Sequence, residues 1–350
     1  MLNGKRRTVY GKTRAEAARK LNDLKAQAGQ SGGALPDPGR QTVGDLLDAW
    51  ISASAPTWKP RRTADVRHYC DAHIRPTIGK VRLSKLTPAA VQSFYNSLKS
   101  TPPSTAWAIH RALHRACRLG VLWGWLGSNP CDRVLPPSYK PGRKEPWSGE
   151  QLAIFLAGTA ESRYHALWVF LVGTGCRLGE AVALRWQDVD LDAGTVCIAR
   201  TAQKINGEWI VTAPKTPAGA RTLAVPNEVV IALRRQRART AERRLRAGAN
   251  WCDLGLVFSN DSGGYLSFST VEWAMSTACK RLGLPPLTPH GLRHLHASLL
   301  LHEGLSLPEV SRRLGHANTQ ITAAVYSHAL GADDSRAAAA IGRALAGGAR

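Results

Sequence analysis

Hydrophobic residues between positions 42 and 134 recur with the three- to four-residue spacing of amphipathic helices. The spacing predicts one helix around Leu46, Leu47, Trp50 and Ile51, a second marked by Val66, Tyr69 and Ile74, a third over Pro88–Leu98, and a long fourth over Ser104–Leu126. Each helix has one apolar side, which becomes buried only if the helices pack together. We therefore expect residues 42–134 to form an all-helical domain.

The pattern changes after a basic stretch rich in proline and glycine at 135–146, which is typical of a linker. Residues 147–330 mix helical spacing with short alternating runs, of which Thr195–Ile198, Trp209–Thr212 and Arg221–Val225 are strand-like. A turn at 214–219 separates the last two runs and predicts a hairpin with Lys215 at its tip. We expect a mixed domain with a small sheet.

The two ends of the chain carry too little apolar sequence for cores of their own. Residues 1–28 predict a short basic strand and a helix opened by Thr13, residues 29–41 a flexible linker, and residues 331–350 an alanine-rich helical tail. The expected fold class is thus multidomain and mainly α, with a helical domain followed by a mixed α/β domain.

The charge of the chain indicates a polyanionic partner. Of 350 residues, 47 are Lys or Arg and 25 are Asp or Glu, so the formal net charge is +22 and the pI is near 10.3. Arginine is spread along the chain, which favours a long contact with nucleic acid over a membrane-surface helix. The arginine-dense stretch Arg234–Arg246 fits either a DNA-facing or a solvated helix, and we favour the solvated one.

The helix over 104–126 carries a basic face opposite its apolar face. The candidate DNA-binding residues are Arg111, His114, Arg115 and Arg118 on this helix, with Arg143 and Lys144 in the following linker. A solvated charged face is an equally good interpretation of the helix alone. His110, His114 and Cys117 have a spacing that could hold a metal, but no fourth ligand is evident.

The cysteines and the apolar runs bear on the cellular compartment. Seven cysteines are widely spaced without a Cys-x-x-Cys pair, which argues against a disulfide framework or a zinc module. No apolar stretch is long enough to span a bilayer, and the N-terminus lacks the apolar core of a signal peptide. We expect a cytoplasmic, nucleoid-associated protein with no membrane partner.

One ordered set of residues in the mixed domain indicates phosphodiester chemistry without a metal. The candidate catalytic residues are Arg177, Lys215, His290, Arg293, His316 and Tyr326, with Glu180 placed to orient Arg177. Two guanidiniums can stabilise a phosphorane, and a tyrosine can serve as nucleophile if a base takes its proton. We assign His290 as that base, His316 as a donor to the phosphoryl group, and Lys215 as the acid for the departing 5′ oxygen. Asp188, Asp190 and Asp192 are interpreted as turn and capping residues rather than metal ligands.

This set resembles the tyrosine recombinase family, in particular its phage-integrase branch, whose signature is Arg, Lys, His-x-x-Arg, His and Tyr in that order. The resemblance implies a fold related to type IB topoisomerases, with 42–134 as the core-binding (SAM-like) domain, 147–330 as the catalytic domain and 1–28 as a remnant of an arm-type DNA-binding domain. It also implies a 3′-phosphotyrosyl intermediate, no nucleotide cofactor, and a homotetramer acting on paired double-stranded attachment sites. A directionality factor and a DNA-bending protein are expected as accessory partners.

The resemblance therefore implies an integrase that moves a mobile element into and out of DNA. Three other activities fit parts of the same pattern: a recombinase that resolves DNA dimers, a type IB topoisomerase, and a catalytically silent DNA-binding protein. The N-terminal remnant favours the integrase, although binding of arm sites is left open. The complete catalytic set argues against the silent protein.

Overall fold

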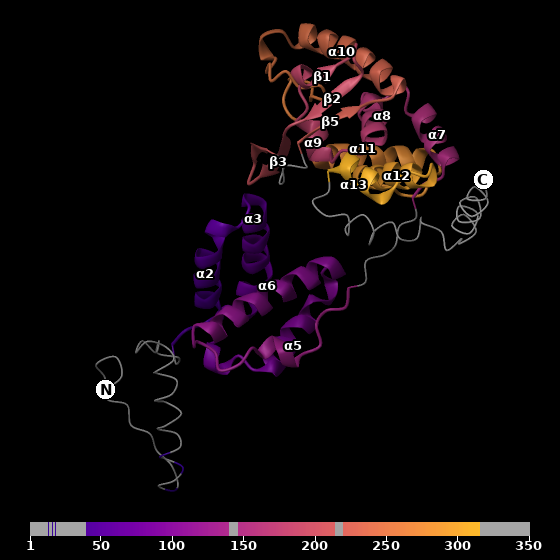
Figure 1. The fold of residues 1–350 in the computed structure, drawn as a ribbon. Coiled ribbons are helices and arrows are strands. Elements are labelled where there is room, and N and C mark those ends of the chain that lie inside the picture. The colour runs from indigo at the N-terminus through magenta and orange to yellow at the C-terminus, as the bar shows by residue number, and fades with distance from the viewer. Residues whose placement is uncertain are drawn as a thin grey trace, which may run out of the picture. The chain divides into compact units, whose positions relative to one another are not determined.

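The computed structural model describes residues 40–139, 146–213 and 220–315, together with Thr13, Glu16 and Ala18. The chain divides into two compact units, Met1–Arg143 and Lys144–Arg350 (Figure 1). Within the N-terminal stretch, the Thr13 hydroxyl accepts a hydrogen bond from the Glu16 amide at 3.2 Å, as expected where a helix begins. The other predictions for 1–28, and those for the tail at 331–350, lie outside the described residues.

The described part of the first unit is helical throughout. Its α-helices are α2 (Val43–Ser54), α3 (Pro60–Tyr69), α4 (Arg75–Ile78), α5 (Pro88–Ser97) and α6 (Pro103–Leu122). Short turns join them: η1 (Ala55–Thr57), the π-helical η2 (Cys70–Ile74), η3 (Leu83–Lys85), η4 (Leu98–Ser100) and η5 (Pro130–Arg133). Helix α2 begins with a capping box, in which the side chains of Thr42 and Asp45 each bond the other's backbone N–H. Proline in the first turn of α5 and α6 fits a position where no amide donor is needed.

The apolar faces predicted from the spacing form the core of this unit. Leu46 and Leu47 of α2 and Ile109 and Leu113 of α6 are all completely buried. Helix α6 is shorter than predicted, because the chain leaves it at Leu122 and Gly124 takes a positive φ of 71°. That conformation ends the helical hydrogen bonding, so the prediction that the helix reaches residue 126 was wrong.

The second unit combines helices with short strands. Its α-helices are α7 (Gly149–Gly158), α8 (His165–Thr174), α9 (Leu178–Val182), α10 (Asn227–Ala247), α11 (Phe268–Arg281), α12 (Pro289–His302) and α13 (Leu307–Leu314). Its strands are β1 (Val189–Asp190), β2 (Thr195–Ile198), β3 (Thr201–Ile205), β4 (Glu208–Thr212) and β5 (Arg221–Ala224), with 3₁₀ turns at η6 (Trp186–Asp188) and η8 (Gly248–Asn250).

The strands form two separate antiparallel groups rather than one. Strands β1, β2 and β5 make a three-stranded sheet in that order, with Val196 opposite Leu223, and β3 pairs with β4 alone. The tight turn of the β3–β4 hairpin is Asn206-Gly207, and both residues have positive φ, as a type I′ turn requires. The predicted hairpin between residues 209–212 and 221–225 was therefore wrong, because these two strands pair with different partners.

Helix α8 lies at the centre of the second unit and packs against both α10 and α12 (Figure 1). Leu167, Trp168, Phe170 and Leu171 of α8 are at most 1% exposed, so the helix is buried on most of its circumference. This burial holds the C-terminal end of α8 in position. The loop that leads to Arg177 follows Thr174, the last residue of the helix.

Several arginines of α10 hold the surface of the second unit together. Arg234 bonds the Asp192 carboxylate at 2.9 Å, Arg244 bonds Asp253 at 3.0 Å, and Arg243 donates to the Ser259 carbonyl at 2.9 Å. Arg234 and Arg244 remain exposed while they make these contacts, so the face is largely solvated, as we favoured from the sequence. Asp192 and its neighbours also behave as expected, since the Asp190 carboxylate accepts from the amides of residues 192 and 193.

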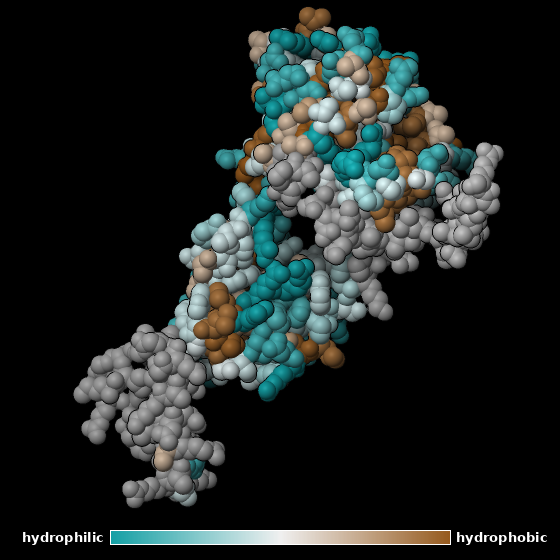
Figure 2. All heavy atoms as spheres, viewed as in Figure 1, coloured by the Kyte–Doolittle hydropathy of each residue, from teal (hydrophilic) through white to brown (hydrophobic). Residues whose placement is uncertain are grey.

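The surface of the described residues is predominantly hydrophilic on the face shown in Figure 2, with scattered hydrophobic areas. This distribution agrees with buried apolar cores inside both units: one cluster in the first unit, and a large cluster with a smaller one between α12 and α13 in the second. No helix among the described ranges has the length and apolar character needed to cross a membrane.

Candidate active site

The loop between α8 and α9 is shaped by Gly175. Helix α8 ends there with a left-handed φ of 63°, and the Gly175 amide donates to the Leu171 carbonyl at 2.9 Å. A Cβ atom on Gly175 would lie 2.5 Å from Cδ2 of His296 and 2.8 Å from Cδ2 of Leu314. Only glycine fits both the conformation and the space, and the chain then passes Cys176 to reach Arg177.

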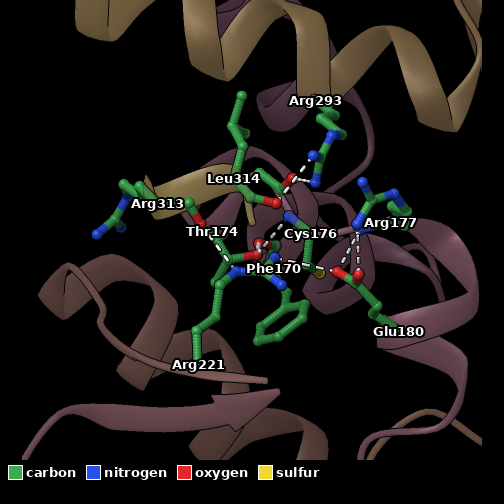
Figure 3. A network of polar contacts seen from close by, with 10 residues as sticks. Phe170, Thr174, Cys176, Arg177, Glu180, Arg221, Arg293, Arg313 and Leu314 are labelled. Atoms are coloured by element: carbon green, nitrogen blue, oxygen red, sulfur yellow. Dashed lines mark hydrogen bonds and ion pairs between the residues drawn. The ribbon is translucent and has the colours of Figure 1, made fainter. Parts of the chain in front are cut away.

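Arg177 is the N-cap residue that precedes α9, and it is held by Glu180 (Figure 3). The Arg177 side chain donates to Oε1 of Glu180 at 2.8 Å, and its backbone N–H donates to Oε2 at 2.9 Å. The Glu180 side chain is 4% exposed, whereas the Arg177 side chain is 44% exposed. The carboxylate therefore fixes a guanidinium that still reaches solvent, in agreement with the prediction that Glu180 orients Arg177.

A second arginine, which the sequence analysis did not single out, completes this network. Arg221, the first residue of β5, donates to Oε2 of Glu180 at 3.0 Å and through Nε to the Arg313 carbonyl at 2.8 Å. Burial opposes ionisation of Glu180, but the charges of Arg221 and Arg177 outweigh it, so the pKa of Glu180 lies below its usual value. One sequence signal was present: strand alternation places Arg221 on the same face as the buried Leu223.

Arg293 lies on α12 and joins the loop to the end of α13. Its guanidinium donates to the Gly175 carbonyl at 2.8 Å and to the Leu314 carbonyl at 2.9 Å, and the residue is 2% exposed. Burial, with the nearby charge of Arg177, lowers the pKa of Arg293 to about 10, so it stays charged at neutral pH. Two of its five N–H groups are used in these bonds, which leaves donors for a substrate oxygen.

His290 stands at the exposed start of α12, one turn before His294. The two rings meet edge to face with centroids 4.6 Å apart. Desolvation by the surrounding protein, followed by the charges of His294, Arg293 and Arg177, lowers the pKa of His290 to about 4. The ring is therefore neutral at pH 7 and can accept a proton.

His296, six residues after His290 on α12, has a structural role. Its Nδ1 lies 2.6 Å from the Val172 carbonyl, and its Nε2 accepts from Arg313 at 3.2 Å. These two contacts require a neutral ring protonated on Nδ1. Burial and the charge of Arg313 lower the pKa of His296 to about 4, in keeping with that state.

The structure thus brings together Arg177, Glu180, His290 and Arg293 from the predicted set. Lys215, His316 and Tyr326 lie outside the described residues, although β5 begins at this site and α13 ends there. Their assignments remain predictions. Within the described ranges, no group of three or more His, Cys, Asp or Glu side chains could hold a metal ion.

The basic face of α6 is present in the first unit. Arg111, Arg115 and Arg118 are exposed. Partial burial, followed by the charges of Arg62 on α3 and of Arg111, lowers the pKa of Arg115. The Arg62 guanidinium also lies 5.0 Å from the centre of the Trp58 ring. The four arginines Arg62, Arg111, Arg115 and Arg118 are called the α3–α6 basic face below.

The other predicted DNA contacts of this unit differ in their surroundings. His114 lies at the edge of the basic face, where its Nε2 is 2.8 Å from the Asp132 carboxylate. His110 is buried, and its Nδ1 is 2.8 Å from the Tyr95 hydroxyl, so it is part of the core rather than of a metal site. Arg143 and Lys144 lie outside the described residues.

Comparison with known proteins gives consistent matches to one family. Residues 150–332 match the phage integrase family, and residues 42–99 match the phage integrase N-terminal SAM-like domain. The chain is 28% identical to a XerC-like tyrosine recombinase of Caldanaerobacter subterraneus subsp. tengcongensis, covering 94% of this chain and 90% of the relative. It is also 28% identical to an integrase of Streptomyces ambofaciens, covering 90% and 83% respectively.

Two solved structures share the fold at low sequence identity. The integrase of transposon Tn1549, in complex with a circular intermediate DNA, superposes with a TM-score of 0.71 at 18% identity, covering 85% of this chain and 98% of that one. A lambda integrase tetramer bound to a Holliday junction gives a TM-score of 0.60 at 18% identity, with 90% and 88% covered.

Proposed function

Because this chain belongs to the phage integrase family and is a site-specific tyrosine recombinase of mobile elements, we propose how its own residues perform strand cleavage and rejoining. The observation that carries the proposal is the convergence of Arg177, Glu180, His290 and Arg293 on the loop after α8. Two guanidiniums beside a neutral imidazole match the needs of a phosphoryl transfer that begins from a protonated phenol.

In the proposed first step, the Tyr326 oxygen attacks a phosphorus of the DNA backbone. The bond from phosphorus to the phenolic oxygen forms, and the bond to the 5′ oxygen breaks. His290 accepts the phenolic proton, and Lys215 gives a proton to the departing oxygen. Rejoining reverses these roles, with the 5′ hydroxyl of a partner strand attacking the 3′-phosphotyrosine. The phosphodiester energy is kept in the covalent intermediate, so the reaction needs no nucleotide cofactor.

Arg177, Arg293 and His316 are assigned to the non-bridging oxygens, where negative charge grows in the transition state. Removing one such donor typically slows a reaction by about 10²–10³-fold. The exposure of the Arg177 side chain supports a direct contact of its guanidinium with the phosphate. An approaching phosphate also favours the imidazolium form of His290, which raises the pKa of this histidine from its low starting value and makes it a better base.

The same proposal assigns DNA contacts to the first unit and to the linker that follows it. Arg111, Arg115 and Arg118 are exposed on one side of α6 together with Arg62, as phosphate-binding arginines would be. His114, Arg143 and Lys144 complete the proposed contacts. We further propose a homotetramer on paired double-stranded attachment sites, helped by a directionality factor and a DNA-bending protein, in the cytoplasm at the nucleoid.

The decisive experiment is covalent trapping on DNA. The full-length protein is incubated with nicked duplexes carrying candidate attachment sites, and the products are separated on a denaturing gel and mapped by mass spectrometry. We expect a 3′-phosphotyrosyl peptide that contains Tyr326, and none from Tyr326→Phe, which should still bind the site. An adduct formed by Tyr326→Phe would refute the nucleophile assignment. Relaxation of supercoiled DNA lacking paired sites would favour a topoisomerase-like activity.

A further inference from the structure

We propose that Arg221 is a positioning residue for strand cleavage. By offsetting the negative charge of Glu180, Arg221 allows the exposed guanidinium of Arg177 to attract the DNA phosphate. The inference rests on the proposed function, since it concerns the same phosphate. Its basis is geometric: Arg221 is a buried arginine that bonds the same carboxylate as Arg177, but from a different element of the fold (Figure 3).

The first part of the argument concerns charge. Arg177 and Glu180 form an ion pair at 2.8 Å, and such a pair taken alone has no net charge to offer a phosphate. Arg221 shares the carboxylate at 3.0 Å, so the triad of two arginines and one glutamate carries a net positive charge. The Arg221 and Glu180 side chains are 8% and 4% exposed, so water screens their interaction weakly. Arg177 is the exposed member of the triad, so a phosphate meets the net positive charge at the Arg177 guanidinium.

The second part concerns position. Arg221 begins β5 directly after the segment that carries Lys215, and its Nε holds the Arg313 carbonyl near the end of α13, three residues before His316. One side chain thereby bonds both Glu180 of α9, which holds Arg177, and the Arg313 carbonyl of α13. Arg221 thus contacts both the carboxylate that holds Arg177 and the end of α13, after which the chain continues to His316.

The test compares two substitutions in the full-length protein on a nicked attachment-site duplex. Arg221→Gln keeps hydrogen-bond donors but removes the charge, whereas Arg221→Lys keeps the charge. We expect the dissociation constant for DNA to change less than about threefold in both. Single-turnover formation of the covalent adduct should slow by about 10- to 100-fold in Arg221→Gln, less than on loss of a direct phosphate donor. Arg221→Lys should recover most of the rate.

Arg200→Gln is the matched control, because it removes an arginine that pairs with the Asp188 carboxylate in the same unit but outside this network. Melting temperatures of all variants are measured alongside the rates. We expect Arg200→Gln to cleave at the wild-type rate even if it melts as early as Arg221→Gln. A similar rate loss in both variants, or equal losses in Arg221→Gln and Arg221→Lys, would overturn the inference.

The two levels of the proposal fail in different ways. If the wild type forms the Tyr326 adduct and Arg221→Gln forms it equally fast, only the role of Arg221 is refuted. If the wild type binds the duplex and forms no adduct, the proposed cleavage itself is refuted, and the role of Arg221 with it.

Discussion

Replacing Gly175 by alanine should destabilise the second unit and disturb Arg293 at the same time. The added Cβ would lie 2.5 Å from Cδ2 of His296 and 2.8 Å from Cδ2 of Leu314, both closer than van der Waals contact allows. His296 cannot easily move aside, because both of its ring nitrogens are engaged, one with Val172 and one with Arg313.

The expected cost has two contributions. A non-glycine residue in the left-handed region costs roughly 1–2 kcal/mol, and overpacking a closely packed site costs typically about 1–3 kcal/mol. Their sum is about 2–5 kcal/mol in the free energy of unfolding. For a domain of this size, each kcal/mol lowers the melting temperature by about 2–4 °C, so a fall of the order of 10 °C is expected.

Thermal unfolding followed by circular dichroism gives the melting temperature, and hydrogen exchange of peptides from residues 165–182 assigns the loss to this region. Gly207→Ala is the matched control, because Gly207 has a φ of 88° but a Cβ added there would meet no atom within 4 Å. Gly207→Ala should lose only the roughly 1–2 kcal/mol that a non-glycine residue costs in the left-handed region. If Gly175→Ala loses no more stability than Gly207→Ala, the steric part of the reasoning is wrong.

Two further predictions concern pH and salt. His296 has a folded-state pKa of about 4 against an unfolded value of about 6.5, so the unfolded chain alone takes up this proton as the pH falls through 6.5. Stability to denaturant should therefore be fully present above about pH 6.5 and decline toward pH 4, and the decline should be shallower in His296→Gln. Arg115→Ala on the α3–α6 basic face should weaken DNA binding and reduce the slope of log K against log salt by about 1, as measured by titration at several salt concentrations. An unchanged slope would mean that Arg115 does not contact a phosphate.

Much of the helical part of the fold could be predicted because helix periodicity is a local property. The apolar residues of α2 and α6 repeat often enough to define a buried face without knowledge of its partner. The end of α6 was missed because it depends on Gly124, whose positive φ is not evident from the residue type alone. From the sequence alone, a glycine inside a helix cannot be distinguished from a glycine that follows the end of a helix.

Strand pairing was predicted less well because it is decided between distant segments. Strand β3 was missed, and β4 was paired with β5 instead. The Asn206-Gly207 pair, which is typical of a type I′ hairpin, was the local signal that could have placed the turn correctly. It lies between two short strands of only five residues each, too short for alternation to stand out.

The ordered motif residues of the candidate site and the supporting Glu180 were evident in the sequence, whereas the supporting arginines were not. Arg177 and Glu180 are three positions apart and could be paired on helix geometry. Arg221 and Arg313 could not, because an arginine that bonds buried carbonyls is indistinguishable in sequence from one that points into water. The Arg221 side chain makes contacts across 41 and 92 residues of chain, and the Arg313 side chain reaches the Gly173 carbonyl across 140.

The two arginine bonds to the end of α13 also set a geometric limit on the nucleophile. Arg221 and Arg293 hold the carbonyls of residues 313 and 314, so the chain beyond Gly315 leaves from a fixed point beside Arg177. Tyr326 follows Gly315 by eleven positions, and a fully extended chain of that length spans at most about 40 Å. Any phosphate that Tyr326 attacks, in its own subunit's site or in a neighbour's, must lie within that radius, extended by the length of the tyrosine side chain, of the anchored end of α13.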